Sequence, residues 1–153
     1  MSEQIKQQLK QLNKQVKELT AIYHHAAIKA GLSDGEFWVF YALLLLDGEY
    51  TQQDICDMWS LPKQTIHSVI TTLAKKGYVF LETIPGTRNK KIIRLTQGGK
   101  SISENTMSGI FQAEQRALAR LTEQERQLYL SLLVKYTSLL QEEMQRIPSA
   151  LEQ

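Results

Sequence analysis

The sequence predicts a mainly α-helical fold with one small β-hairpin. Three observations support this prediction: apolar residues recur at helical spacing over long stretches, hydroxyl–acid pairs mark helix starts, and only two short segments have strand character. The chain has 153 residues, of which 42% are hydrophobic, so it has the length of about one domain. A chain this apolar can bury a core, which excludes intrinsic disorder.

A long first helix is expected over residues 3–30. Its apolar side chains alternate at spacings of four and three, at Ile5, Leu9, Leu12, Val16, Leu19, Tyr23 and Ala26. This heptad pattern is typical of a helix that packs along another helix. Gly31 should end it, because glycine readily adopts the positive φ of a helix C-terminus.

Hydroxyl–acid pairs predict the starts of three further helices. In each pair the acid follows the hydroxyl by three residues, which is the capping-box spacing: Ser33 with Glu36, Thr51 with Asp54, and Thr122 with Glu125. The corresponding helices should cover residues 34–46, 52–60 and 123–146. Another helix should begin at Pro62, whose ring suits a first helical position, and end at Gly77.

The hairpin is predicted from residues 78–84 and 91–95, which read as strands. Pro85 and Gly86 lie between them and suit the central positions of a type II turn. After Thr96 the pattern returns to a helix that should extend to about residue 119.

Basic residues are concentrated in the middle of the chain, although the net charge is only +2. Residues 60–101 contain eight basic and one acidic side chain, whereas residues 1–59 carry a net −3 and residues 102–153 a net −2. The basic segment coincides with the second short helix and the hairpin. Two short helices followed by a hairpin predict a winged helix-turn-helix, which places one helix in the major groove of double-stranded DNA.

The helix that begins at Pro62 has two unlike faces. At 100° per residue, its apolar face comprises Ile66, Val69, Ile70 and Leu73. The opposite face holds Gln64, His67, Ser68, Thr71 and Lys75, with Lys63 and Thr65 at its margins. A solvated surface helix usually alternates Glu with Lys, whereas amide, hydroxyl and imidazole groups dominate here. This face is therefore predicted to bind DNA.

The hairpin tip is predicted to contact phosphates or the minor groove. Its basic residues are Arg88, Lys90, Lys91 and Arg94, and the sequence around them suggests no nearby acid. Such residues neutralise phosphates and release counterions, so they contribute affinity without sequence preference.

Four segments in this order resemble the MarR family of bacterial winged helix-turn-helix regulators. They are Thr51-Gln-Gln-Asp-Ile-Cys-Asp-Met-Trp59, Leu61-Pro-Lys-Gln-Thr-Ile-His-Ser68, Leu73-Ala-Lys-Lys-Gly-Tyr-Val79 and Leu95-Thr-Gln-Gly-Gly99. The last is similar to the family's Leu-Thr-x-x-Gly after the wing. With the long helices at both ends, the resemblance covers nearly the whole chain.

The resemblance implies a cytoplasmic homodimeric repressor that binds a near-palindromic operator. Residues 1–32 and 97–153 would form the dimerisation region, and residues 33–96 the DNA-binding domain. It assigns DNA contacts to Lys63, Gln64, Thr65, His67, Ser68 and Thr71 of the recognition helix. The family's wing commonly reads Asp-x-Arg, but the aligned residues here are Thr87, Arg88 and Asn89. Either Arg88 or Asn89 would then make the groove contact, beside Lys90 and Lys91.

The family also implies a small aromatic or anionic effector that releases the repressor. His25, Trp38 and Tyr41 are the candidates to line its pocket. A redox-sensing regulator that uses Cys56 is an alternative, but Cys56 is expected on the inner side of its helix, where a thiol is inert. His24 and His25 point about 100° apart on a helix, and the sequence places no Cys or Asp partner with them, so no metal site is expected. No cofactor is expected either.

The sequence lacks the motifs of the common enzyme classes and of membrane proteins. It has no complete Gly-rich phosphate loop, no His-Glu-x-x-His and no Gly-x-Ser-x-Gly. Its longest apolar run, residues 37–46, is half the length needed to span a bilayer, and no secretion signal is seen. A winged-helix module that binds protein instead of DNA is the other alternative, but it should have a neutral or acidic wing.

Overall fold

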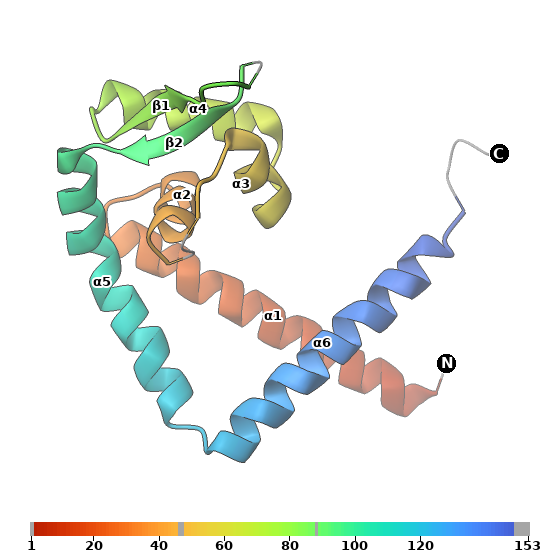
Figure 1. Ribbon diagram of the computed structural model, residues 1–153. Coiled ribbons are helices and arrows are strands. Elements are labelled where there is room, and N and C mark those ends of the chain that lie inside the picture. Colours follow the sequence, from red (N-terminus) through yellow and green to blue (C-terminus); the bar gives the residue numbers. More distant parts are fainter. Residues whose placement is uncertain (1, 46–47, 88, 149–153) are drawn as a thin grey trace. The chain divides into compact units, whose positions relative to one another are not determined.

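The computed structural model describes residues 2–45, 48–87 and 89–148 (Figure 1). The chain divides into two compact units, residues 1–110 and 111–153, which are considered separately. The first unit contains α1 (Glu3–Lys29), α2 (Asp34–Leu45), α3 (Gln52–Trp59), α4 (Lys63–Lys75), β1 (Val79–Thr83), β2 (Lys91–Leu95) and the first part of α5 (Gln97–Ala119). The second contains the rest of α5 and α6 (Glu123–Gln145). The mainly α-helical prediction with one hairpin is therefore confirmed.

The predicted helix starts form as capping boxes. Thr51 and Thr122 each accept a hydrogen bond from the backbone N–H of the acid three residues on, and each acid accepts from the threonine N–H in return. Ser33 and Glu36 make the same pair of bonds at the start of α2. These contacts satisfy amide groups that a helix start otherwise leaves unpaired.

The predicted element boundaries are accurate to within a residue or two, and Pro62 shows one of the differences. It is the N-cap of α4, with Lys63 as the first helical residue, so the expectation that Pro62 begins the helix is wrong by one position. The extended backbone of Pro62 (ψ 140°) places it just outside the helix. Residue 46, the expected end of α2, lies outside the described residues.

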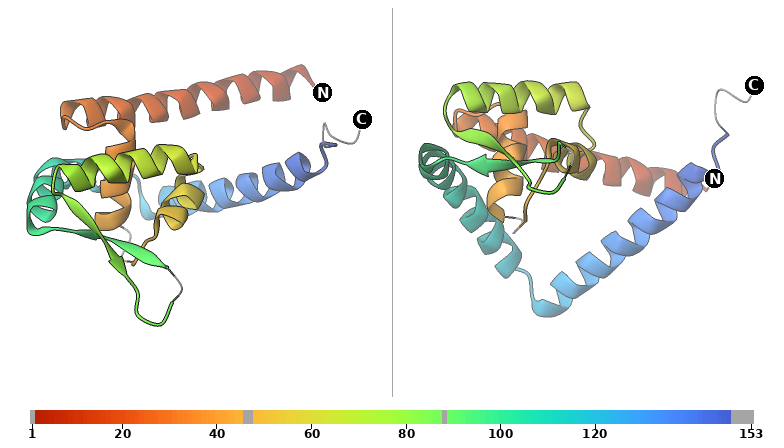
Figure 2. Two further views of the ribbon diagram at one scale, coloured as in Figure 1. Left: turned by 90° about the horizontal axis from the view of Figure 1, so that it is seen from above. Right: turned by 45° about the horizontal axis from the view of Figure 1, so that its top comes forward.

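The hairpin is antiparallel, with Leu81 opposite Ile93 at its centre. Gly86 has a φ of +79°, and the Thr87 N–H donates to the Ile84 carbonyl, as the expected turn requires. The Ile93 N–H donates to the Tyr50 carbonyl, which attaches β2 to the segment before α3. In Figure 2, left, the two strands extend as an arm away from the helices of this unit.

The core of the first unit lies where α2, α3 and α4 meet the hairpin. Its fully buried large side chains include Phe37, Phe40, Ile55, Ile66, Ile70 and Leu73. The start of α5 is attached to the hairpin by Thr96, whose hydroxyl accepts from the Gly99 N–H and donates to the Gly77 carbonyl. Gly99 is buried against the backbone of Tyr78. The Leu-Thr-x-x-Gly motif therefore joins the hairpin to α5.

Two helices carry long apolar stripes that remain exposed. On α1, Ile5, Leu9, Leu12, Val16 and Leu19 are 38–55% exposed. No described residue of α6 is buried, and its exposed large apolar residues are Leu128, Tyr129, Leu130, Leu132, Leu133, Val134, Tyr136, Leu139, Leu140 and Met144. Such continuous apolar surface is uncommon on a monomer.

Candidate nucleic-acid interface

Helices α3 and α4 are joined by a tight turn of three residues. Ser60 closes α3 in the left-handed conformation (φ 50°), and the N–H groups of Ser60 and Leu61 both donate to the Cys56 carbonyl. Pro62 cannot donate a hydrogen bond and has an extended backbone, so it precedes α4 without prolonging α3. The sequence thus produces two consecutive short helices in a helix-turn-helix arrangement.

One face of α4 is buried and the other is exposed, as its sequence predicts. Ile66, Ile70 and Leu73 are at most 2% exposed. The exposed side chains on the predicted DNA face are Lys63, Gln64, Thr65, His67 and Ser68. The sixth predicted residue, Thr71, is half-buried, and its hydroxyl donates to the His67 carbonyl at 2.8 Å. The hydroxyl proton of Thr71 is therefore already used within the helix.

A cavity of about 430 Å³ lies between α3 and the start of α4. It is lined by Gln52, Gln53, Cys56, Lys63, Gln64 and His67. Lys63, Gln64 and His67 are predicted DNA contacts, whereas Gln52 and Gln53 are not. Their position in the first turn of α3, directly after the capping threonine, is the sequence signal that could have identified them. Gln53 donates from Nε2 to Oδ1 of Asp57 at 2.6 Å.

Cys56 lies in the wall of this cavity. The residue is 5% exposed, so the expectation that it faces inward agrees with the structure.

The hairpin tip presents Asn89, Lys90 and Lys91 as exposed residues. Asn89 has a φ of +67°, a conformation that asparagine tolerates better than most residues. Hydrogen bonds from the Thr51 N–H and hydroxyl lower the pKa of Asp54, and the positive charge of Lys90 lowers it further. Arg88 lies outside the described residues.

Arg94 corrects the expectation that the wing has no nearby acid. Its Nε lies 2.7 Å from Glu82 Oε2 and its Nη2 lies 2.5 Å from Glu49 Oε1. The hydrogen bonds to these two carboxylates raise the pKa of Arg94, and the bond to Glu82 raises it more than the bond to Glu49. Arg94 therefore joins the hairpin to the segment before α3, and its charge is offset by acids of the protein itself.

Lys76 is likewise used inside the unit. Its Nζ lies 2.5 Å from Oε1 of Glu36, which is 5% exposed. Burial raises the pKa of Glu36, but the hydrogen bonds from Lys76 and Ser33 outweigh it, so the net pKa is lowered. Fewer positive charges of the basic segment are therefore available to an outside partner than its composition suggests. Within the described part of the chain, the exposed basic residues of this segment without an ion pair are Lys63, Lys75, Lys90, Lys91 and Lys100.

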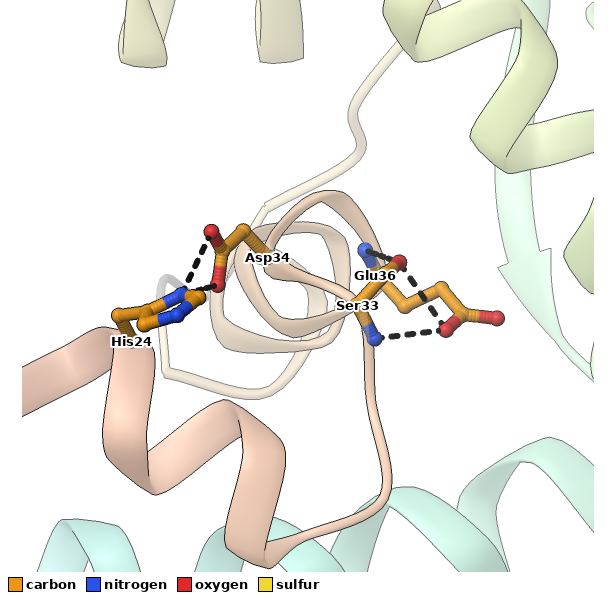
Figure 3. A network of polar contacts seen from close by, with 4 residues as sticks. All are labelled: His24, Ser33, Asp34 and Glu36. Carbon is orange, nitrogen blue, oxygen red and sulfur yellow. Dashed lines mark hydrogen bonds and ion pairs between the residues drawn. The ribbon is translucent and has the colours of Figure 1, made fainter.

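The start of α2 is a junction of polar contacts, shown in Figure 3. On one side, His24 Nδ1 lies 2.9 Å from Asp34 Oδ1. On the other side, Ser33 binds Glu36, which also binds Lys76 at the end of α4. This junction connects α1, α2 and α4.

Aromatic side chains from three helices form a cluster beside the helix-turn-helix. Its members are Tyr23 of α1, Phe37, Trp38 and Tyr41 of α2, and Trp59 of α3. Trp38 and Tyr41, both proposed for an effector pocket, have ring centroids 5.4 Å apart. His25 is exposed, and the ring contact described for it is with His24. The structure thus brings together two of the three predicted pocket residues.

Two kinds of site are not found in the described ranges. Residues 2–45, 48–87 and 89–148 contain no group of three or more His, Cys, Asp or Glu side chains that could hold a metal ion. None of the helices in these ranges is both long enough and apolar enough to cross a membrane.

The sequence model of the MarR family matches residues 30–88, which include α2, α3, α4 and β1. No curated protein sequence matches the chain. The family resemblance inferred from the sequence is confirmed over the matched segment.

Several solved structures share the fold. A MarR family regulator from Neisseria meningitidis has a TM-score of 0.78 and 24% identity, and the match covers 90% of this chain and 96% of that chain. MepR of Staphylococcus aureus, solved as a DNA complex, has a TM-score of 0.68 and 19% identity, with 84% and 93% covered. BpsR of Bordetella bronchiseptica, whose DNA binding is regulated by 6-hydroxynicotinic acid, has a TM-score of 0.61 and 21% identity, with 82% and 89% covered. The winged helix-turn-helix fold is therefore confirmed.

Proposed function

Because residues 30–88 match the MarR family and the fold is that of MarR family structures, we propose that this chain is a sequence-specific DNA-binding transcriptional repressor. One observation carries the proposal. The exposed face of α4 combines hydrogen-bonding side chains with basic residues that have no ion pair within the described part of the chain. We propose no enzymatic activity.

The exposed polar residues of α4 read bases in the major groove. Gln64 and Ser68 can present an amide and a hydroxyl to base edges, which carry distinct donor and acceptor patterns there. His67 and Thr65 flank them. Thr71 contributes less, because its hydroxyl proton is bound to the backbone.

The basic residues bind the phosphate backbone and position α4. Lys63 does so at the start of α4, and Lys90 and Lys91 do so at the hairpin tip, where Asn89 or Arg88 enters the minor groove. Arg94 is left out of this set, because its guanidinium is bound by Glu82 and Glu49. The wing contact is thus concentrated at the tip of the hairpin.

The protein acts as a homodimer on an inverted repeat. The exposed stripes of α1 and α6 support this, since burial of such surface is the main source of association free energy. Residues 1–32 and 97–153 form the dimerisation region, and residues 33–96 form the DNA-binding domain. The two copies of α4 would lie about 34 Å apart, one turn of the duplex.

A small aromatic or anionic effector releases the protein from DNA. Trp38 and Tyr41 lie in contact at the edge of the helix-turn-helix, and both are half-buried. The relative BpsR, which is regulated by 6-hydroxynicotinic acid, supports this class of effector. His25 has no ring contact with the cluster among the described residues and is a weaker candidate for the pocket.

Selection of bound duplexes from a random pool at physiological salt tests the proposal. An enriched inverted repeat, bound by a dimer in analytical ultracentrifugation, is the expected result. Unselected sequences, or no bound duplex, would overturn it and favour a protein-interaction module. A redox-sensing role for Cys56 predicts that peroxide releases the selected duplex from the native protein but not from Cys56→Ser. Because Cys56 is 5% exposed, we expect no such difference.

A further inference from the structure

Gln53, in the first turn of α3, is an exposed glutamine whose amide has a fixed orientation. Its Nε2 donates to Oδ1 of Asp57 at 2.6 Å, one helical turn further along α3. An ionised carboxylate has acceptors and no donor, so the amide oxygen of Gln53 cannot take the place of the nitrogen. The bond uses one of the two hydrogens on Nε2. Gln53 is therefore left with one acceptor, Oε1, and one donor, its second N–H.

Gln53 lines the same cavity as the predicted DNA face of α4. The cavity, of about 430 Å³, is lined from the α4 side by Lys63, Gln64 and His67. In helix-turn-helix proteins the N-terminal residues of the recognition helix contact base edges. A base pair that reaches Gln64 at the start of α4 therefore borders the cavity that Gln53 faces from α3.

The groups left on Gln53 fit a base edge better than a phosphate. A phosphate offers acceptor oxygens and negative charge, so both Oε1 of Gln53 and the carboxylate of Asp57 beside it oppose a phosphate. In the major groove, adenine presents a donor, its N6 amino group, next to an acceptor, N7. An amide that offers one oxygen and one N–H is complementary to this pair, and glutamine is one of the side chains that bind adenine in this way.

We propose that Gln53 reads an adenine from the first helix of the helix-turn-helix and that Asp57 positions its amide. In this motif the first helix ordinarily crosses the DNA backbone, while the second helix reads the bases. Here Oε1 of Gln53 accepts from N6 of adenine, and the second N–H of Nε2 donates to N7. Asp57 acts by preventing the amide from turning over. This inference rests on the proposed function and adds to it a specificity-determining residue outside α4.

Parallel selection of duplexes with the native protein and with Gln53→Ala tests the base contact. We expect the native protein to enrich adenine at one position of each half-site, and Gln53→Ala to lose that preference alone. Gln64→Ala should lose a different position. If Gln53→Ala still enriches the same adenine, or weakens all duplexes alike as loss of a phosphate contact would, the proposal is wrong.

Gln7→Ala is the matched control for the selection. Gln7 donates from Nε2 to Oε1 of Glu3 at 3.2 Å, so this variant also removes a glutamine–acid pair four residues apart on an exposed helix. The pair lies near the start of α1, outside the DNA-binding domain. Gln7→Ala should therefore keep every base preference of the native protein.

Titration of duplexes with one altered base measures the size of the contact. Guanine in place of the adenine in one half-site should lower the affinity of the native protein about 5- to 150-fold, the range for a good bidentate contact. 7-Deazaadenine lacks the N7 acceptor but keeps the base pair, and it should lower the native affinity by part of that factor. Gln53→Ala should bind the adenine and 7-deazaadenine duplexes equally. Equal binding of the two by the native protein would overturn the contact.

Asp57→Asn tests the positioning role. Asparagine has nearly the shape of aspartate but can donate as well as accept, so the amide of Gln53 can turn over and present its nitrogen to O6 of guanine. The variant also removes a negative charge and should bind all duplexes more tightly. The ratio of the affinities for the adenine and guanine duplexes is independent of that uniform gain, and we expect it to fall toward one. A ratio equal to that of the native protein would refute the role of Asp57.

The results separate this inference from the proposed function. If the native protein enriches no duplex, both fail. If it enriches an inverted repeat and Gln53→Ala shares every preference, the proposed function stands and the reading by Gln53 is wrong. If circular dichroism shows that Gln53→Ala does not fold, the ratio for Asp57→Asn, measured at each adenine of the selected half-site, still decides.

Discussion

Two adjacent glycines at the start of α5 should respond to alanine with opposite signs. A Cβ added at Gly99 would lie 1.8 Å from the carbonyl oxygen of Tyr78, whereas one added at Gly98 would have its nearest neighbour, Thr96 Oγ1, at 3.8 Å. The Tyr78 carbonyl cannot easily move away, because it accepts from the Thr96 N–H at 3.0 Å. Gly99→Ala therefore requires the backbone of α5 and Tyr78 to separate.

The size of that separation gives the expected magnitude. Ordinary contact begins at 3.4 Å, so the two groups must part from 1.8 Å to at least that distance. Overpacking a core by added methylenes costs about 1–3 kcal/mol, and a clash with backbone belongs at the upper end of that range. We therefore expect Gly99→Ala to destabilise by about 3 kcal/mol or more, which is about 6–12 °C in Tm for a chain of this size. Gly98→Ala should stabilise by about 0.4–1 kcal/mol, because alanine restricts the unfolded chain.

Thermal unfolding of both variants, followed by circular dichroism at one protein concentration, measures the difference. The concentration must be matched because the proposed dimer would make Tm depend on it. If Gly99→Ala unfolds within 2 °C of the native protein, or if Gly98→Ala is the less stable of the two, the close approach of α5 to Tyr78 is wrong.

Three further predictions concern DNA binding and pH. Gln64→Ala should weaken the selected duplex by about 1–3 kcal/mol while leaving random duplexes unaffected, as titration of both duplexes would show. Lys91→Ala should weaken all duplexes and reduce the slope of log K against log salt by about 0.9 per protomer, which is about 1.8 for the dimer. Arg94→Ala should leave that slope unchanged and lower Tm, because its charge is bound by acids. Equal slopes for the two variants would contradict the distinction. The pKa of Glu36 is lowered in the folded state, so its contribution to stability is complete above its ordinary value of 4.5 and is lost as pH falls through the lowered pKa. Urea unfolding of the native protein should therefore show a steeper loss of stability below pH 4.5 than Glu36→Gln, and parallel curves would refute a role for the contact with Lys76.

Local structure was predictable because its causes lie close together in the chain. A capping box joins residues three apart, and a heptad stripe repeats every three or four, so both can be read without knowing the fold. The exposed face of α4 follows from the same periodicity. The turn at Gly86 could be predicted for the same reason, because its positive φ is a conformation that a single glycine adopts without strain.

The state of individual side chains was less predictable. Thr71 lies on the predicted face, but its hydroxyl binds the backbone one turn earlier, which competes with an outside partner. Gln52 and Gln53 line the cavity because α3 and α4 meet there. Their place in the first turn of α3 could be predicted from the sequence, but the helix that they would face could not.

The order of amino acids is enough to predict the elements, their succession along the chain, the position of the basic segment and the apolar stripe of α1. The charges that remain available, and the groups that lack a partner, depend instead on how the elements pack. Arg94 and Glu49 are 45 residues apart, and Lys76 and Glu36 are 40 apart, so only the packing of separate elements brings them within 2.5 Å. The buried indole N–H of Trp59, for which no acceptor is found among the described residues, arises in the same way, from rings contributed by neighbouring helices. Periodicity and capping act along the chain, whereas charge pairing and burial depend on distances in space.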